Sequence, residues 1–442
     1  MKKTIFLSCL IYTICAQAQS LRVGEWRDHL SYKFAHDDCE LGNSIYISTD
    51  RALFEYNIID NSIERLNTLN RLSDTGVSAI ESSQETLIVA YDNGNIDLIR
   101  GNRTVNLPDI KRASLIADKT VNHINTFNNL AYLSCGFGVV VIDIDREEVK
   151  DTYIIGELGS QTNVLSTSFA HNTLYAATTN GLYRADRHHP NLSDYHAWEK
   201  LPAHTLSHIN HLESFNDLLF VNLHGEEDNT DTLYHFDGNN WVIFGQESTN
   251  VSLKANSEQL ISASRFGVSI YNQDLNKTHT LSSSQFNLGN IDFSSAIYTE
   301  KDGYWIADKH HGLLHHNNQI FESIKPSGPF LSDVGQIKNF GDEIYLAHGA
   351  KNENWDPSWH KSELSILKKD DWITSNILIS ANFRDVVAVN KIGNATYLAS
   401  LNLGLAKMTD LGLDEIYNET NSSIQKRVYD DWIEIGDIQF DS

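Results

Sequence analysis

Apolar and β-branched residues recur along the chain in short runs, each followed by a glycine-containing turn and a second apolar run. Residues 174–183 show the pattern clearly, and residues 304–314 repeat it almost position for position. Seven further copies lie between Ile45 and Leu405. Most copies start about 42–44 residues apart, which is the period of a four-stranded propeller blade. The pattern predicts an all-β repeat protein, a β-propeller of four-stranded blades.

Each repeat contains signals for four strands. A short run ending in an aliphatic residue, such as residues 77–80 or 121–124, precedes the phrase and predicts the innermost strand. The phrase itself supplies the second and third strands, and Asn93-Gly94 and Asn180-Gly181 predict tight turns because glycine tolerates positive φ. A tryptophan marks the start of several outer strands, at Trp198, Trp241 and Trp372. We expect these rings to pack between blades.

The copies suggest two domains. Seven of them precede Pro326 and Pro329, so residues 19–328 are predicted to form a seven-bladed propeller and residues 329–442 the beginning of a second, incomplete one. Residues 428–438 could start a tenth repeat. Residues 23–32 resemble an outer strand without inner strands before it, and we expect them to complete a blade begun at the other end of the ring. One irregular ring of nine or ten repeats, or an N-terminal strand belonging to the second propeller, stays open as an alternative.

The N-terminus has the form of an export signal. Lys2 and Lys3 precede an apolar stretch that ends near Ala16 and Ala18, which predicts a signal peptide at residues 1–18. Ile14 before Cys15 argues against lipidation. No later segment reaches the 18 apolar residues of a membrane-spanning helix. The mature chain is therefore predicted to be exported, without a transmembrane span, and either soluble or held at a surface by other proteins.

The charge of the chain limits the classes of partner that it can bind, and its cysteine content indicates whether it forms a disulfide. The chain has 58 acidic and 34 basic residues, a formal charge of −24, and no Lys/Arg cluster. Nucleic acid is therefore disfavoured as a partner, because phosphate binding requires concentrated positive charge. Cys39 and Cys135 remain after the signal, and we expect two buried thiols rather than a disulfide.

No catalytic motif is present: there is no G-x-S-x-G elbow, H-E-x-x-H or P-loop. Four groups could bind a metal: His310, His311, His315 and His316; His188 and His189; Asp143 and Asp145; Glu226, Glu227 and Asp228. A turn separates the two pairs in the first group, and strand alternation would scatter them, so a solvated loop is favoured. Turn and solubility roles are favoured for the acids. We predict no catalytic, metal-binding or cofactor-binding residues, although two carboxylates from different blades could still meet.

The phrases at residues 174–183 and 304–314 resemble the two-component regulator propeller repeat. A signal peptide followed by Gly24-Glu25-Trp26-Arg27-Asp28-His29-Leu30-Ser31-Tyr32 and this array resembles the N-terminal region of the PorZ-like propeller proteins of the type IX secretion system of Bacteroidetes. The resemblance implies a non-catalytic role at the outer-membrane surface. It implies as partners a sortase-like protein, a β-barrel and a further subunit, and help in attaching anionic lipopolysaccharide to secreted cargo. These proteins continue into a second propeller and a sorting domain, so the chain is expected to be a fragment.

Two other functions remain open. The chain could be the periplasmic sensor propeller of a hybrid two-component histidine kinase, which predicts a transmembrane helix and a kinase domain downstream. It could also be a propeller-fold polysaccharide lyase or glycosidase, which predicts activity on acidic glycans that depends on a carboxylate or histidine in the central channel.

Overall fold

The computed structural model describes residues 26–202, 208–225, 230–247, 249–317, 320–354, 356–361, 363–374, 377–410, 412–428 and 431–440. These residues fall into two compact units. The first is Asp28–Asp333, and the second contains Val334 and the residues that follow it, together with Trp26 and Arg27. Each unit is built of four-stranded antiparallel sheets.

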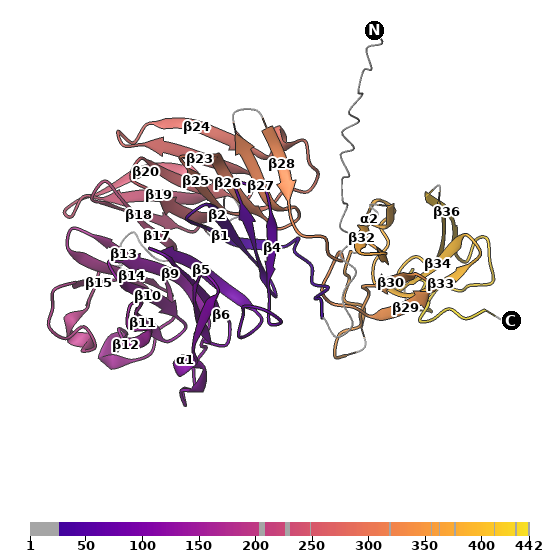
Figure 1. The fold of residues 1–442 in the computed structure, drawn as a ribbon, viewed down its shortest axis with the longest axis horizontal. Helices are drawn as coiled ribbons and strands as arrows, with labels where there is room; N and C mark the ends of the chain where they lie inside the picture. The colour runs from indigo at the N-terminus through magenta and orange to yellow at the C-terminus, as the bar shows by residue number, and fades with distance from the viewer. Residues whose placement is uncertain are drawn as a thin grey trace, which may run out of the picture. The chain divides into compact units, whose positions relative to one another are not determined.

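The first unit contains seven sheets (Figure 1), numbered here as blades in chain order. Their strands are, in blade 1, β1 (Ala35–Leu41), β2 (Ser44–Thr49), β3 (Leu53–Asn57) and β4 (Ile63–Leu66); in blade 2, β5 (Val77–Ser83), β6 (Thr86–Tyr91), β7 (Ile96–Arg100) and β8 (Arg103–Leu107); in blade 3, β9 (Val121–Phe127), β10 (Leu130–Cys135), β11 (Gly138–Asp143) and β12 (Glu148–Tyr153); in blade 4, β13 (Val164–Ala170), β14 (Thr173–Thr178), β15 (Gly181–Asp186) and β16 (Glu199–Lys200). They continue, in blade 5, with β17 (Ile209–Phe215), β18 (Leu218–Leu223), β19 (Asp231–Phe236) and β20 (Trp241–Glu247); in blade 6, β21 (Asn250–Ala255), β22 (Gln259–Ser264), β23 (Gly267–Asn272) and β24 (Lys277–Ser282); in blade 7, β25 (Phe293–Thr299), β26 (Gly303–Asp308), β27 (Gly312–Asn317) and β28 (Ile320–Ile324). Short helices occupy loops: α1 (Asp109–Arg112), η1 (Glu157–Gly159), η2 (Tyr195–Ala197) and η3 (Ser283–Phe286).

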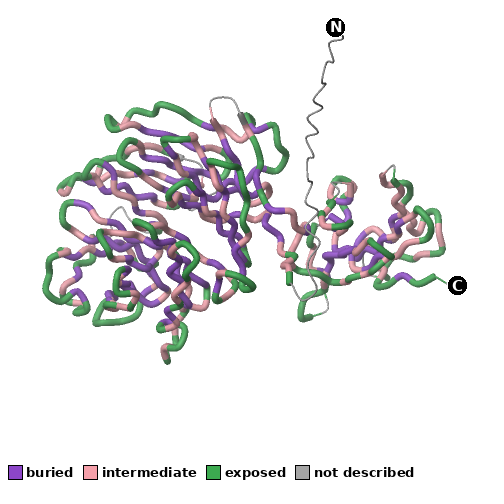
Figure 2. The backbone as a smooth tube through the Cα atoms, in the orientation of Figure 1, coloured by how far each residue is buried: buried purple, intermediate pink, exposed green. Residues whose placement is uncertain are grey.

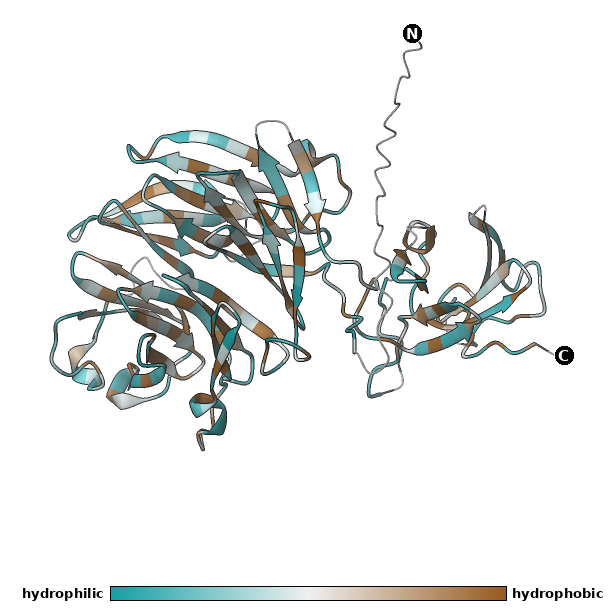
Figure 3. Ribbon diagram, in the orientation of Figure 1, coloured by the Kyte–Doolittle hydropathy of each residue, from teal (hydrophilic) through white to brown (hydrophobic). Residues whose placement is uncertain are grey.

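Strand alternation builds a separate core between each pair of neighbouring blades. In β6 every residue is buried, with Leu87 and Val89 packing toward blade 1 and Ile88 and Ala90 toward blade 3. Outer strands such as β24 are exposed along most of their length. Figures 2 and 3 show the result, with buried and hydrophobic residues inside the sheets and polar residues toward the rim.

The seven blades close into a ring. Each innermost strand lies beside the innermost strand of the next blade, and β25 of blade 7 lies beside β1 of blade 1. Figure 1 shows the indigo strands of blade 1 next to the orange strands of blade 7. Trp305 and Ala307 of blade 7 share one core with Ile45 and Phe54 of blade 1. The unit is therefore a seven-bladed β-propeller, and one irregular ring of all the repeats is excluded.

The predicted role of residues 23–32 as a blade-completing strand is wrong for the described part of that segment. Residues 26–32 form no strand, and all four strands of blade 7 come from β25–β28. Tyr32 is instead buried in the core between blades 1 and 7, and Ser31 donates its backbone N–H to Ser332 Oγ at 2.9 Å. Because blade 7 already has four strands, the segment lies across the seam and closes it with side chains rather than with strand pairing.

Gly94 lies at a predicted turn, at a position that only glycine can occupy. Gly94, between β6 and β7, has a φ of +79°, and a Cβ there would come within 2.6 Å of the Ile110 side chain. Both the left-handed backbone and this close approach exclude larger residues.

The second unit contains two sheets. They are β29 (Gln336–Phe340), β30 (Glu343–Ala347), β31 (Ser365–Lys368) and β32 (Asp371–Thr374), then β33 (Val386–Ile392), β34 (Ala395–Ser400), β35 (Leu405–Thr409) and β36 (Gly412–Tyr417), with α2 (Ile377–Ser380) between them. The suggested tenth repeat is not a strand in its described residues. Ile433 makes a single parallel bridge to Leu403, and Ile438 packs on Ala388 and Ala399. None of the helices among the described residues is long and apolar enough to cross a membrane.

Candidate functional site: the central channel

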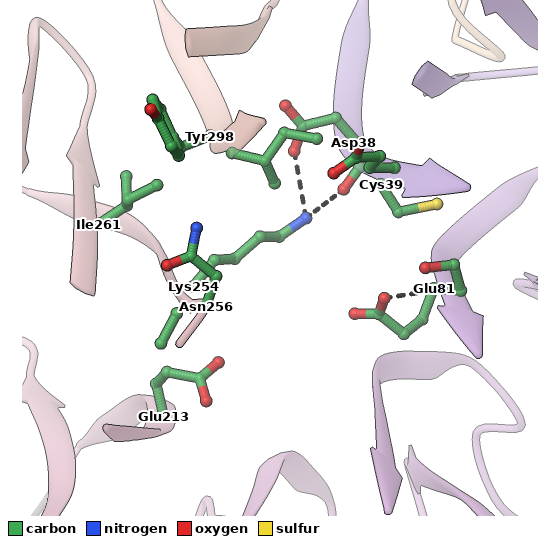
Figure 4. A pocket seen from close by; sticks show the side chains of 12 residues that line it. Asp38, Cys39, Glu81, Glu213, Lys254, Asn256, Ile261 and Tyr298 are labelled. Carbon is green, nitrogen blue, oxygen red and sulfur yellow. Dashed lines mark hydrogen bonds and ion pairs between the residues drawn. The ribbon is translucent and has the colours of Figure 1, made fainter. Parts of the chain in front are cut away.

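Equivalent positions of the innermost strands bring chemically active side chains to one level of the ring. Glu81, Glu213 and Lys254 are each the fifth residue of their strand, in β5, β17 and β21. Blades repeat around an axis, so equivalent positions lie at similar depth. These residues, with Asp38 of β1 and Ile297 of β25, line a cavity of about 200 Å³ (Figure 4). We call it the channel cavity, because its walls come from the innermost strands of five blades.

Among the described residues, Lys254 is the one lysine or arginine in the wall of the channel cavity. Its Nζ donates hydrogen bonds to Asp37 Oδ1 at 2.7 Å, to Asp38 Oδ1 at 3.1 Å and to the carbonyl oxygen of Asp38. The Asp38 side chain is fully buried and that of Lys254 is 22% exposed. An ammonium group has three N–H donors, so these bonds use its whole capacity.

Burial and the charge of Lys254 act in opposite directions on the pKa values of Asp37 and Asp38. Burial favours neutral Asp37, but the Lys254 ammonium and the N–H groups of Ile80 and Asp38 outweigh it, so the pKa of Asp37 lies below its ordinary value. At Asp38, burial outweighs the attraction of Lys254, and the pKa is raised. Burial also opposes the charge of Lys254, but the neighbouring carboxylates raise the pKa of its ammonium. The network therefore holds Lys254 charged.

Two glutamates face the channel cavity without such a partner. Burial raises the pKa of Glu81 to about 7, against an opposing effect of Lys254. Burial raises the pKa of Glu213 to about 8, and the charge of Glu81 adds to the effect. Both groups therefore titrate near neutral pH, where ordinary carboxyl groups are already ionised.

Two histidines and one thiol complete the channel, and each is electrically neutral. Burial lowers the pKa of His123 and of His211 to about 4. Burial raises the pKa of the Cys39 thiol well above its usual range. A protonated thiol is a poor nucleophile, so Cys39 does not have the character of an activated catalytic cysteine.

We expect Glu213→Gln to change how stability depends on pH. The folded state retains the Glu213 proton up to about pH 8, whereas the ordinary pKa is 4.5, so the free energy of unfolding falls as pH rises through this window. Glutamine cannot ionise, so the variant should match wild type near pH 4 and be more stable by a few kcal/mol above pH 8. Urea denaturation across this range measures the difference. Glu148→Gln, at an exposed position of β12, is the control, and parallel profiles for wild type and Glu213→Gln would contradict the expectation.

The structure does not bring the predicted metal-site candidates together. His315 stacks on Trp305 at 3.8 Å between ring centroids, whereas His311 is half-buried and its Nε2 lies 2.7 Å from the Gly289 carbonyl oxygen. His310 lies near Phe34, and His316 packs on Phe321. The second pair, His188 and His189, lies in an exposed loop between β15 and η2.

The acidic candidates have turn roles or lie outside the described residues. Asp143 accepts the backbone N–H of Arg146 at 3.0 Å, and Asp145 accepts a hydrogen bond from Asn129. Glu226, Glu227 and Asp228 are not among the described residues. Within the described ranges, no three histidine, cysteine or acidic side chains are arranged to hold a metal ion. Cys39 and Cys135 are buried free thiols, as predicted.

Sequence reasoning missed the channel residues. Their signal was an acidic or basic residue at the fifth position of an innermost strand, one residue after the aliphatic residue that marks it, as at Glu81 and Glu213. A single such residue looks like an exposed position of an amphipathic strand. Only ring closure shows that several of them share one cavity.

The ring of seven four-stranded sheets around a charged channel defines a β-propeller repeat protein. Residues 45–199 match the family model of the N-terminal β-propeller domain of PorZ from the type IX secretion system. Over residues 45–199 the chain is similar to the PorZ propeller domain, and its fold is PorZ-like. No curated protein matches the sequence.

A solved structure of PorZ shows the same fold. The chain is similar to PorZ of Porphyromonas gingivalis, described as an essential bacterial surface component of that system, with a TM-score of 0.77 and 18% identity over 92% of this chain and 55% of that one. It therefore spans about half the length of that PorZ. Similarity also extends to the extracellular domain of a protein named as a hybrid two component system of B. thetaiotaomicron (TM-score 0.49, 14% identity, 90% of this chain and 55% of that one). A third match is the WD40 propeller domain of Doa1 (TM-score 0.47, 11% identity, 65% and 92%).

Proposed function

We propose that the protein is a non-catalytic surface scaffold or adaptor of the type IX secretion system attachment complex. The observation that carries the proposal is the match of residues 45–199 to the PorZ propeller model, supported by the similarity in fold to PorZ over 92% of the chain. On this proposal the protein is exported, with residues 1–18 as its signal peptide, and acts at the outer-membrane surface or in the periplasm. Its partners are a sortase-like protein and an outer-membrane barrel, residues 19–328 form the first propeller, and residues 329–442 are the beginning of a second, incomplete one.

The chemistry of the channel favours binding over catalysis. Among the described wall residues, Glu81 and Glu213 have pKa values raised toward or above neutral pH, and burial holds the Cys39 thiol beside them neutral. We propose that anionic lipopolysaccharide, which this scaffold would help to attach to cargo, binds outside the channel. Lys254, the cation described in the cavity wall, is already paired with Asp37 and Asp38, so the described wall offers an incoming anion no free positive charge.

Recovery of partners from outer membranes tests the proposal. The tagged full-length protein, produced in its own bacterium, should co-purify with the sortase-like protein and the barrel, and deletion of its gene should leave secreted cargo unattached at the cell surface. A strain that produces the untagged protein is the control. Recovery of no secretion-system subunit, with normal cargo attachment in the deletion strain, would contradict the proposal.

A further inference from the structure

Glu81 and Glu213, two of the carboxyl-bearing residues that line the channel cavity, form no ion pair among the described residues. Glu81 Oε1 accepts a hydrogen bond from the backbone N–H of Ser82 at 2.7 Å, and Glu213 Oε1 accepts one from Ser214 at 2.8 Å. Figure 4 shows the two side chains turned toward the same open space from opposite sides.

Lys254, the ammonium described in the wall, has no N–H donor left for Glu81 or Glu213. Lys254 spends its three N–H donors on Asp37 and Asp38, in the hydrogen bonds described above. Asp38 is itself unsatisfied: it is 0% exposed, it lines the cavity, and no donor among the described residues makes a hydrogen bond with its Oδ2. The nearby Ser295 hydroxyl favours the Asp38 charge but does not reach hydrogen-bond geometry with this oxygen. A buried polar atom without a partner is unfavourable, so the cavity has acceptors to offer a donor from outside.

The size and the apolar wall of the cavity limit what that donor can be. About 200 Å³ is less than the roughly 300–1,000 Å³ of sites for drug-sized ligands. Ile261, Ile297 and Tyr298 line the cavity beside the glutamates. A group with a short aliphatic stem and one positive end suits both walls, because the stem packs on apolar side chains while the charged end meets carboxylates.

We propose that the channel cavity receives one alkylammonium group, the side chain of a lysine on a partner polypeptide, between Glu81 and Glu213. Lysine is the residue that presents this group on a protein surface, and an acidic chain attracts basic partners. The proposal deepens the scaffold function, on which it rests for a polypeptide partner, by naming the chemistry that the partner must present.

Binding of this group depends on pH through the two glutamates. The ionisable groups around them are Asp37, Asp38, Cys39 and Glu40 of β1 and Lys254 of β21, and the neighbouring innermost strands carry His123 in β9 and His211 in β17. Above pH 6 the histidines stay neutral and Lys254 stays charged, so the glutamates are the groups whose charge changes. Each loses its proton as pH rises toward about 8, and the ligand ammonium keeps its charge to about pH 10. Affinity should therefore rise between pH 6 and 8.5, with release of protons to the buffer.

Calorimetric titration of the full chain with Nα-acetyl-lysine methylamide tests this inference. We expect binding at pH 8.5 that weakens severalfold at pH 6, and no binding of the Nε-acetylated probe, which lacks the charge. Glu213→Gln and Glu81→Gln should each weaken binding by about tenfold or more, whereas Glu148→Gln should not change it. Thermal melts of each variant confirm that it is folded.

Three results would overturn the inference: no binding of the lysine probe at pH 8.5, equal binding of the acetylated probe, or unchanged affinity in folded Glu213→Gln. The titration needs no secretion-system component. If the lysine probe does not bind but secretion-system partners are recovered from outer membranes, only the lysine site is contradicted. If the probe binds but no such partner is recovered, only the scaffold function is contradicted.

Discussion

Replacing Lys254 by methionine is expected to lower the free energy of unfolding by about 3–5 kcal/mol. The substitution leaves the carboxylates of Asp37 and Asp38 near the propeller axis with no cation, and Asp38 has no exposed surface through which water could replace it. Urea denaturation at pH 7 measures the loss. The loss should shrink in acid, because the pKa of Asp37 lies below its ordinary value and its stabilising charge disappears as pH falls through the folded-state pKa.

A surface lysine supplies the matched control for Lys254→Met. Lys200 forms an ion pair of 3.1 Å with Glu157, but its side chain is 36% exposed and that of Glu157 is 71% exposed. Lys200→Met should therefore cost no more than about 1 kcal/mol. Adding Asp38→Asn to Lys254→Met should recover part of the loss, because one of the unpaired carboxylates is removed. Equal losses for the two lysine variants would show that the buried network does not stabilise the ring.

Replacing Trp305 by alanine is expected to cost about 3–5 kcal/mol and to loosen the seam between blades 7 and 1. Trp305 has no exposed surface, stacks on His315, lies 5.4 Å from Tyr56 between ring centroids and donates its Nε1–H to Thr299 Oγ1 at 3.2 Å. Its removal leaves a large cavity in the core that blade 7 shares with blade 1. Denaturation measures the total loss, and amide hydrogen exchange shows where the ring opens.

Two controls separate seam opening from general destabilisation. Trp26→Ala, at a side chain in a residue that is 85% exposed, should stay within about 0.5 kcal/mol of wild type. Phe220→Ala removes a fully buried ring from the core between blades 5 and 6. Exchange in β1 and β25 should increase more in Trp305→Ala than in Phe220→Ala, and equal increases would contradict a role of Trp305 in holding the seam.

The blades could be predicted from sequence because their signal is local. In β6 the residues that face one neighbour alternate with those that face the other, so the strand is apolar throughout and its ends are marked by turn residues such as Gly94. The buried thiol of Cys135 follows from the same logic, since it ends the largely apolar strand Leu130–Cys135, whereas Cys39 lies between Asp38 and Glu40. The resemblance to PorZ-like proteins also depended on short phrases and on their order along the chain.

How the ring closes was harder to predict from the sequence than the blades. The segment before Tyr32 has the composition of an outer strand, yet blade 7 obtains its fourth strand from β28, which leaves this segment no partner to pair with. Residues 428–438 likewise contain aliphatic residues at strand spacing, but Ile433 and Ile438 pack on the β33–β36 sheet of the second unit as irregular chain. In both cases the outcome depends on which strand edges are already occupied, and composition does not contain that information.

The sequence by itself determined that the chain is built of four-stranded blades and to which propeller proteins it is similar, because strand alternation and turn residues act over a few neighbouring positions. Only the tertiary structure decided that seven blades close and that Asp38, Glu81, Glu213 and Lys254 share one cavity. These residues are separated by up to five repeats, and they meet because ring closure brings equivalent positions to a common axis. Their charges and protonation follow from burial at that axis, which no stretch of the sequence specifies alone.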